Sequence, residues 1–399
     1  MKINGKITIT GSKSETNRLL LLQALSDHAF EILNVSNSKD SQVMQAALTS
    51  KEEEVNIGIA GTAMRFLTAY FAVKEGRKTI LTGIGRMLER PVGILVDALN
   101  ELGAEITFVN KKGYPPLEIR GKKIEKNCIE IPADVSSQYV TALMLIAPFL
   151  EKGLTIHLKG KITSIPYIEM TQGLLQRVGV KCVFKGNQIK IIPSTILMET
   201  QTVESDWSSA SYYYSLLAIS DGGEIQLGSY REDSLQGDKE LVTIYKNFGI
   251  ESVFIENQVI LKKKENVEQP DFIALDLNDT PDIAQTIAVT CTALKIKCKL
   301  TGLATLKIKE TDRLEALKLE LFKFGAQVIT TNNSLEIKDF GEAQANIEVK
   351  TYHDHRMAMA FAPLKLYHDF TIEDRNVVEK SYPDFWNDFE KLGISFIDK

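Results

Sequence analysis

Two patterns of apolar and polar residues alternate along the chain. In the first, an apolar helix-forming segment ends in glycine and leads into a short segment rich in β-branched residues, as in LNELGAEITF around Gly103 and LLQRVGVKCVF around Gly179. The pattern returns around Gly249, Gly325 and Gly393. Glycine is typical of the position after a helix because it adopts positive φ freely, and the residues that follow favour a strand. The spacing, roughly 70 to 75 residues, predicts an internal repeat.

The second pattern places a short polar or glycine-containing turn directly before an apolar helix. Its six copies start at Gly11, Ala60, Ala133, Ser205, Asp279 and Tyr352. Several of these helices are apolar on nearly every face, which predicts that they are buried all round. Together the two patterns predict an α/β fold of six βαβ-type units, with helices inside and sheets outside. The first unit is expected to be shortened, because Arg18 and Arg65 take similar places in consecutive turns only 47 positions apart.

Length, charge and cysteine usage narrow the class of protein. The 399 residues exceed what one hydrophobic core usually organises, so two domains are expected. The formal net charge of -5 gives nucleic acid or an anionic membrane no global attraction. No signal-peptide-like or membrane-spanning apolar run is found, which favours a cytoplasmic protein. The scattered cysteines form no CxxC pair, and this predicts free thiols rather than disulfides or zinc ligands.

Polar turns at helix starts are candidate anion sites. Converging helix N-termini present free N–H groups and positive dipole ends. Ser, Thr and Asp in such turns can equally be simple N-caps, but a cap needs no cation. Basic residues nevertheless accompany the turns in five stretches, which are 13–18, 90–91, 309–313, 354–356 and 380–383. Surface charge could explain each stretch alone, yet Arg90 and Arg356 lie at helix starts, where a cation opposes the dipole. The pattern therefore predicts negatively charged substrates.

Other chemistries find less support in the sequence. His353 and His355 are spaced i, i+2, which does not place both rings on one helix face, and no third metal ligand is evident. The chain has no GxSxG nucleophile elbow and no Walker A sequence, and GSKSETN is not a dinucleotide fingerprint. Neither a metal nor a cofactor is therefore expected.

Nine segments resemble one family when they are taken together and in order. They are GSKSETNR, IAGTAMRF, ERPVGILVDAL, DVSSQYVTAL, IPYIEMT, TPDIAQTIA, KIKETDRLEAL, YHDHRMAMAF and EKSYPDFW. The chain resembles the 5-enolpyruvylshikimate-3-phosphate synthases from Gly11 to about Trp386. The resemblance implies two similar domains of three βαβαββ units, formed by residues 13–205 and by residues 1–12 with 206–399. It places the active site in the cleft between them, and it implies a cytoplasmic monomer without nucleic-acid or membrane partners.

The resemblance also implies a reaction. The enolpyruvyl group of phosphoenolpyruvate passes to the 5-hydroxyl of shikimate 3-phosphate and phosphate is released, a step toward chorismate and the aromatic amino acids. Asp282 is the implied base for the hydroxyl and Glu310 the implied acid for C3 of phosphoenolpyruvate, while Lys380 shares proton transfer. Shikimate 3-phosphate would bind Lys13, Ser14, Arg18, Ser136, Ser137, Gln138, Ser164, Tyr167, Asp282 and Lys309. Phosphoenolpyruvate would bind Lys13, Gly61, Arg90, Gln138, Arg313, Arg356 and Lys380.

Three positions depart from the family pattern. Ile59 stands where an Asn is usual, Phe66 where a Pro is common, and Thr305 where an Asn often contacts substrate. Ile59 cannot donate the hydrogen bond of an amide, so we expect altered sensitivity to glyphosate, the herbicide that competes for the phosphoenolpyruvate pocket of the family. Two alternative functions remain: the sister enzyme that transfers enolpyruvyl to UDP-N-acetylglucosamine, and a non-catalytic anion-binding relative.

Overall fold

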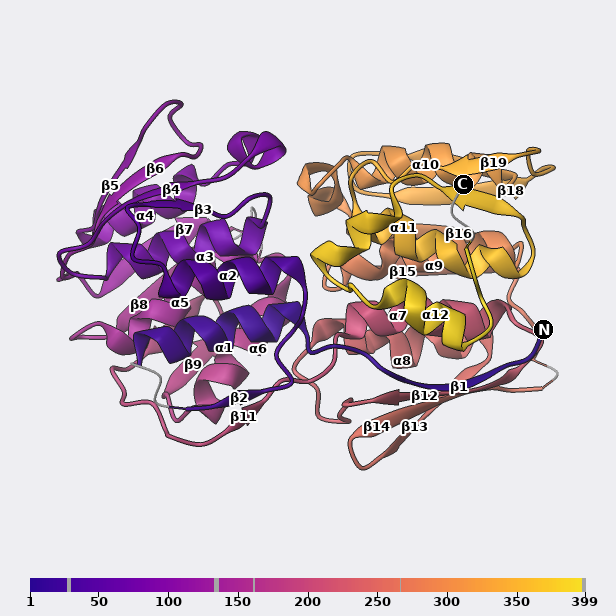
Figure 1. Ribbon diagram of the computed structural model, residues 1–399, viewed down its shortest axis with the longest axis horizontal. Coiled ribbons are helices and arrows are strands. Elements are labelled where there is room, and N and C mark those ends of the chain that lie inside the picture. The colour runs from indigo at the N-terminus through magenta and orange to yellow at the C-terminus, as the bar shows by residue number, and fades with distance from the viewer. Residues whose placement is uncertain (27–29, 133–135, 161, 266, 397–399) are drawn as a thin grey trace. The chain divides into compact units, whose positions relative to one another are not determined.

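The chain forms two compact units, shown in the computed structural model of Figure 1. The structure describes residues 1–26, 30–132, 136–160, 162–265 and 267–396. We call Ser12–Val203 the continuous unit, and Met1–Gly11 with Glu204–Lys399 the discontinuous unit. The chain therefore begins in one unit, builds the whole of the other, and then returns to complete the first.

The continuous unit alternates helices and short strands. Its elements are α1 (Lys13–Leu25), β2 (Ile32–Leu33), α2 (Lys39–Thr49), β3 (Glu54–Asn56), α3 (Gly61–Ala72), β4 (Lys78–Thr82), η1 (Gly85–Glu89), α4 (Gly93–Leu102), β5 (Glu105–Phe108), β6 (Leu117–Arg120), β7 (Cys128–Pro132), α5 (Ser137–Ile146), η2 (Ala147–Phe149), β8 (Leu154–Lys159), α6 (Ile165–Arg177), β9 (Cys182–Lys185), β10 (Gln188–Ile191) and β11 (Gln201–Thr202).

The discontinuous unit follows a similar order. Its elements are β1 (Ile3–Thr8), α7 (Trp207–Ile219), β12 (Gly223–Gly228), η3 (Gly237–Glu240), α8 (Leu241–Ile244), η4 (Tyr245–Phe248), β13 (Ile250–Ile255), β14 (Gln258–Lys263), β15 (Phe272–Asp276), η5 (Pro281–Ile283), α9 (Ala284–Ala293), β16 (Lys297–Thr301), η6 (Ala304–Ile308), α10 (Arg313–Lys323), β17 (Ala326–Thr330), β18 (Leu335–Phe340), β19 (Ile347–Val349), α11 (His355–Phe361), η7 (Ala362–Leu366), β20 (Phe370–Ile372), η8 (Arg375–Lys380) and α12 (Phe385–Lys391).

Four sheets in the described part of the chain have four strands and share one topology. Their strand orders are β3-β4-β6-β5, β7-β8-β10-β9, β15-β16-β18-β17 and β1-β12-β14-β13. In each sheet the first two strands are parallel, and the other pairings are antiparallel. A parallel pair needs a crossover, which a helix supplies, whereas an antiparallel hairpin needs only a short turn. A local crossover of this kind builds three of these sheets, whereas β1 and β12 are connected through the whole continuous unit and α7.

Two further sheets consist of two parallel strands each, β11-β2 and β19-β20. The first contains the strand that follows α1, so this part of the chain lacks the closing hairpin of the four-stranded sheets. The second lies near the C-terminus, where we predicted a strand directly after Gly393. That prediction is wrong for the described residues 394–396, which form no strand. Phe396 instead packs its ring against those of Trp386 and Phe370, at centroid distances of 4.9 and 5.8 Å, and so serves the core.

The five predicted helix ends and the six predicted turn-to-helix starts are confirmed, but the helix start expected at Arg90 and Pro91 is wrong, because α4 begins only at Gly93 and Arg90 is the C-cap of η1. The five glycines that we placed after helices all have positive φ, between 77° at Gly249 and 112° at Gly103. Helices follow all six predicted turns, beginning at Lys13, Gly61, Ser137, Trp207, Ala284 and His355. The turn expected from Ala133 falls partly on residues 133–135, which lie outside the described residues. Nearly every side chain of α3, α5, α7 and α9 is buried, as their apolar sequences predicted.

Candidate active site

Arg18 is the best-buried cation of the continuous unit's predicted site. Its side chain donates from Nε to Thr171 Oγ1 at 2.9 Å, and from Nη1 to the carbonyl of Ser14 at 2.7 Å. A third, longer hydrogen bond runs from Nη2 to the carbonyl of Tyr167 at 3.4 Å. Burial lowers the pKa of Arg18 to about 10, which still leaves it charged at neutral pH. These hydrogen-bond acceptors are neutral oxygens, while the nearby carboxylate of Glu15 attracts the guanidinium through space.

Gly61 and Arg90 lie in direct contact at the start of α3. A Cβ atom built on Gly61 would meet Arg90 Nη1 at 2.3 Å, so only glycine lets the guanidinium approach the helix this closely. The residue before the helix is Ala60, which provides no side-chain cap. A cation therefore lies at the positive end of a helix, an arrangement that gains nothing in stability and is typical of anion sites.

The other predicted residues of the continuous unit lie at the starts of α1, α5 and α6. Ser136 caps α5 and Gln138 Nε2 donates to Thr62 Oγ1 of α3 at 3.2 Å. Ser164 precedes α6 with a φ of 54°, a strained value for a residue other than glycine. Lys13 Nζ lies 3.4 Å from Asp40 Oδ2. Ser14, Ser137 and Tyr167 are half-buried. Because α1, α3, α5 and α6 pack against one another, these helix starts belong to one part of the unit.

Arg313 organises the predicted site of the discontinuous unit. Its side chain is 2% exposed and donates from Nε to Asp354 Oδ2 at 2.6 Å, from Nη1 to Asp282 Oδ1 at 3.0 Å, and from Nη2 to Glu310 Oε2 at 3.0 Å. Burial opposes its charge, but the three carboxylates outweigh that effect and raise its pKa further. The guanidinium thus fixes the predicted base Asp282 and the predicted acid Glu310 on either side of itself.

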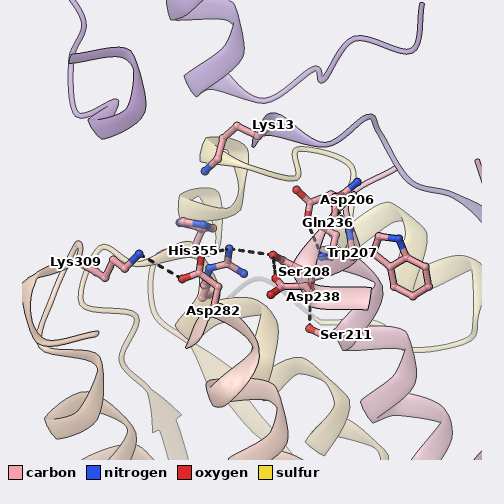
Figure 2. Close-up of polar contacts among 12 residues, drawn as sticks. Lys13, Asp206, Trp207, Ser208, Ser211, Gln236, Asp238, Asp282, Lys309 and His355 are labelled. Atoms are coloured by element: carbon pink, nitrogen blue, oxygen red, sulfur yellow. Dashed lines mark hydrogen bonds and ion pairs between the residues drawn. The ribbon is translucent and has the colours of Figure 1, made fainter. Parts of the chain in front are cut away.

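Two further cations reach Asp282. Arg356 Nη2 lies 3.2 Å from Asp282 Oδ2, and Lys309 Nζ lies 3.7 Å from Asp282 Oδ1, as Figure 2 shows for Lys309. The attraction of Asp282 would raise the pKa of Lys309, yet burial and the nearby arginines Arg313 and Arg356 lower it overall. Asp282 is therefore held by three cationic side chains, those of Arg313, Arg356 and Lys309.

Glu310 is also bound by Lys380. Lys380 Nζ donates to Glu310 Oε1 at 2.8 Å, and the lysine is only 7% exposed. The two residues come from segments 70 positions apart, before α10 and at the end of η8. A carboxyl and an ammonium at this distance can exchange a proton directly, because both lie within hydrogen-bond reach.

Asp238 and Ser208 join this cluster although the sequence did not single them out. Ser208 Oγ donates to Asp238 and accepts from Arg356 Nη2 at 3.2 Å (Figure 2). Asp238 is 6% exposed, and burial, followed by the negative charge of Asp282, raises its pKa to about 7. The sequence around Asp238, a Gly-Asp pair after an irregular loop, does not predict a place in the site. Only the fold brings η3, which contains Asp238, to the start of α7, which contains Ser208.

The structure thus groups the predicted residues by unit. We call the predicted residues of the continuous unit its cluster, in which the contacts join Arg18 to Ser14 and Tyr167, Gly61 to Arg90, and Ser136 to Gln138. The cluster comprises Lys13, Ser14, Arg18, Gly61, Arg90, Ser136, Ser137, Gln138, Ser164 and Tyr167. The cluster of the discontinuous unit contains Asp282, Lys309, Glu310, Arg313, Arg356 and Lys380. No group of three or more possible metal ligands occurs among the described residues, and none of their helices is long and apolar enough to cross a membrane.

The three positions that depart from the family pattern have different surroundings. Ile59 is 45% exposed, just before α3. Phe66 is fully buried on the same helix, and its ring centroid lies 5.5 Å from Arg18 Cζ, so it supports that guanidinium from one side. Thr305 is half-buried, and its hydroxyl has no hydrogen-bond partner.

The chain is similar to known proteins over nearly its whole length. The family model of EPSP synthase (3-phosphoshikimate 1-carboxyvinyltransferase) matches residues 1–50 and 45–389. A 3-phosphoshikimate 1-carboxyvinyltransferase of Bacteroides fragilis (strain YCH46) is 44% identical over 398 residues, covering 98% of this chain and 96% of that protein. One from Colwellia psychrerythraea is 35% identical over 421 residues, with the same coverage. A solved structure of EPSP synthase from Acinetobacter baumannii has a TM-score of 0.78 at 20% identity and covers 99% of this chain and 96% of that one, which indicates the same mixed α/β fold.

The family model matches in two segments that overlap at residues 45–50. This overlap lies at the end of α2, after the short strand β2 and before β3, the first strand of a four-stranded sheet. The alignment is therefore interrupted where the chain lacks the closing hairpin seen in its neighbours.

Proposed function

The chain belongs to the EPSP synthase family, and we propose that it transfers the enolpyruvyl group of phosphoenolpyruvate to the 5-hydroxyl of shikimate 3-phosphate. The family match over nearly the whole chain supports the reaction. The observation that carries the mechanism is the contact of Asp282 and Glu310 with one buried arginine, Arg313. An acid and a base that bind two sides of one fixed guanidinium suit a reaction that removes a proton from the 5-hydroxyl and adds a proton to C3 of phosphoenolpyruvate.

The proposed reaction begins with addition. Asp282 accepts the proton of the 5-hydroxyl as its oxygen attacks C2 of phosphoenolpyruvate, and Glu310 delivers a proton to C3. The tetrahedral intermediate then collapses: the 5-oxygen stays bound to C2, a proton leaves the methyl carbon, the double bond re-forms, and phosphate departs. Lys380, at 2.8 Å from Glu310, can supply and recover the proton of that carboxyl. Such acid–base steps contribute about 10²- to 10⁴-fold each.

Each of the two anions is proposed to bind residues from both clusters. Arg18, with neutral acceptors only among its hydrogen bonds described above, is suited to the charge of shikimate 3-phosphate, together with the hydroxyls of Ser136, Ser137 and Ser164. The further groups proposed to contact this substrate are Lys13, Ser14, Gln138, Tyr167, Asp282 and Lys309. Two polyanions repel each other, so fixed cations must offset that repulsion in the transition state.

Phosphoenolpyruvate is proposed to bind Arg90 and Arg356, with Lys13, Gly61, Gln138, Arg313 and Lys380 also in contact. Arg313 already binds three carboxylates through four of its five N–H groups, so a direct contact with the substrate would use the second N–H of Nη1. We further propose that residues 13–205 and residues 1–12 with 206–399 act as two three-unit domains of an inside-out α/β barrel, and that the site is completed in the cleft between them. The enzyme is proposed to act as a cytoplasmic monomer.

A phosphate-release assay tests the proposed function. The purified chain with phosphoenolpyruvate and shikimate 3-phosphate should release phosphate, and should not do so with UDP-N-acetylglucosamine. Release with the sugar nucleotide alone would make the protein the sister enzyme, and no release with either acceptor would make it a non-catalytic anion-binding relative.

Sensitivity to glyphosate tests the phosphoenolpyruvate site. An exposed Ile59 beside α3 offers no donor to an anionic inhibitor, so Ile59→Asn should lower the glyphosate concentration for half-inhibition by about tenfold, the effect of one hydrogen bond to a charged group. Ile84→Asn, which changes another exposed isoleucine of the same unit, is the matched control. Equal inhibition of Ile59→Asn and the unaltered enzyme would contradict the assignment.

A further inference from the structure

Glu320 of α10 is a buried carboxylate outside the proposed reaction. It has no exposed surface. Its Oε2 accepts from Lys323 Nζ at 2.6 Å and from the backbone N–H of Lys350 at 3.1 Å, and its Oε1 accepts from the hydroxyl of Tyr352 at 2.7 Å. A charge removed from water so completely persists only with such partners. Two of these donors lie in the segment that leads into α11.

That segment contains a strained turn. Tyr352 and His353 have φ values of 54° and 56°, so two consecutive residues other than glycine adopt the left-handed conformation. Tyrosine and histidine rarely adopt this conformation, and they keep it only when the surrounding structure holds them in it. The hydrogen bonds from Lys350 and Tyr352 to Glu320 fix the first half of this turn, up to and including Tyr352, the first residue of the strained pair.

The residues after the turn belong to the proposed site. Asp354 follows directly, caps α11 by accepting from the backbone N–H of Arg356 at 2.9 Å, and binds Arg313. Glu320 lies seven residues after Arg313 on α10, which corresponds to two turns along one helix face, about 10 Å. One helix therefore holds the segment at two points: Glu320 binds Lys350 and Tyr352, the first residue of the strained pair, and Arg313 binds Asp354, directly after the pair.

We propose that Glu320 and Tyr352 are positioning residues for this site: their hydrogen bond keeps the Tyr352–His353 turn in its left-handed conformation and so sets the direction from which Asp354 and Arg356 approach Asp282 and Arg313. Neither residue touches the reacting atoms in this scheme. The inference rests on the proposed function, because that function assigns Arg356 to phosphoenolpyruvate.

Tyr352→Phe tests the inference because it removes the hydroxyl and keeps the ring. The variant should raise KM for phosphoenolpyruvate by about five- to tenfold, while KM for shikimate 3-phosphate stays within about twofold. Tyr214→Phe is the matched control, since Tyr214 of α7 also donates or accepts a 2.7 Å hydrogen bond, with Ser252, and has no part in the proposed site. This control should lose stability without a selective change in KM.

A rescue variant and a measurement without catalysis complete the test. Adding His353→Gly to Tyr352→Phe should return KM for phosphoenolpyruvate toward its original value, because glycine takes positive φ without strain. Amide hydrogen exchange over residues 350–357 should be faster in Tyr352→Phe and unchanged in Tyr214→Phe. If both single variants show the same KM values and the same exchange in this segment, the inference is wrong. The exchange result decides the role of the turn even if the unaltered chain releases no phosphate, an outcome that would overturn only the proposed function.

Discussion

At the scale of single residues, the two clusters differ in how their arginines are balanced. Arg18 donates to a hydroxyl and two carbonyls, whereas Arg313 donates to three carboxylates. A guanidinium among neutral oxygens retains its attraction for an anion, while one among carboxylates mainly fixes their positions. This difference supports a binding role for Arg18 and a role for Arg313 in orienting Asp282 and Glu310.

Glu310→Gln should lower kcat by about 10²- to 10⁴-fold, since the amide keeps the shape of the side chain but cannot pass a proton to C3. Steady-state phosphate release measures the effect. Glu315→Gln is the matched control, because Glu315 is an exposed carboxylate five residues away, in the first turn of α10, and forms a surface ion pair with Lys318. A Glu310→Gln enzyme with kcat within about threefold of the unaltered one would exclude this carboxyl as the acid.

Asp238→Asn should flatten the pH dependence of stability. The folded protein holds the pKa of Asp238 at about 7, above the value of about 3.9 in an unfolded chain, so between these values the folded state binds more protons. This group therefore stabilises the fold at low pH, and that contribution is lost as pH rises toward 7, by roughly 1.4 kcal/mol per pH unit.

Urea unfolding at pH 5, 6 and 7 would show the difference between Asp238→Asn and the unaltered protein. Asp233→Asn, which changes an exposed carboxyl of the same loop, should keep the original slope. Parallel pH profiles of Asp238→Asn and the unaltered chain would mean that Asp238 does not take up a proton in this range.

At the scale of elements, helix starts carry most of the proposed site. α3 begins with Gly61 against Arg90, α5 is capped by Ser136, and α11 is capped by Asp354. Each start leaves backbone N–H groups without partners inside the helix, so a cap or an anion must satisfy them. Each repeat that buries an apolar helix therefore also presents the N-terminus of that helix, where an anion can bind.

Gly61→Ala should raise KM for phosphoenolpyruvate about tenfold or more and leave KM for shikimate 3-phosphate within about threefold. The new Cβ would lie 2.3 Å from Arg90 Nη1, so the guanidinium must move away from the start of α3. Gly341→Ala is the control, because a Cβ there meets no atom within 4 Å and the residue has no positive φ. Unchanged KM values for Gly61→Ala would remove Arg90 from the phosphoenolpyruvate site.

At the scale of the whole molecule, the chain crosses between two units that each have a basic cluster. The discontinuous unit uses both chain termini, because β1 pairs with β12 in parallel across more than two hundred residues. The crossover is anchored on that unit: Ser205 Oγ donates to the carbonyl of Ile9 at 2.6 Å, and Gln236 donates to the carbonyl of Ser205 at 2.9 Å. The two segments that connect the units, near Ile9 and near Ser205, are therefore both held by hydrogen bonds within the discontinuous unit.

Shikimate 3-phosphate should stabilise the continuous unit, which holds most of the residues proposed to bind it. At a concentration of 100 times its Kd, a ligand of the folded state adds about 2.7 kcal/mol to the unfolding free energy. Hydrogen exchange should slow in α1, α5 and α6, and the melting temperature should rise. Shikimate without the phosphate, at the same concentration, is the control and should give a smaller shift; equal shifts would contradict a phosphate site at Arg18.

The sequence by itself determined the elements and most of the site candidates. Gly103 and the other four predicted glycines mark helix ends because positive φ is a local property, and the burial of α3, α5, α7 and α9 follows from their apolar sequences. The strand expected after Gly393 does not form in the described residues 394–396, where Phe396 packs against distant aromatic residues, Phe370 and Trp386. Pairing partners of a short segment cannot be read from its own residues.

Only the tertiary structure decided which side chains meet. It brought Asp354 and Asp282 onto Arg313 from two distant segments, and it joined Asp238 to Arg356 through Ser208. It also raised the pKa of Asp238, because burial and the charge of Asp282 arise only after folding. Neighbouring residues in the sequence determine local conformation, whereas the electrostatic interaction between side chains depends on distances and burial that only the whole fold sets.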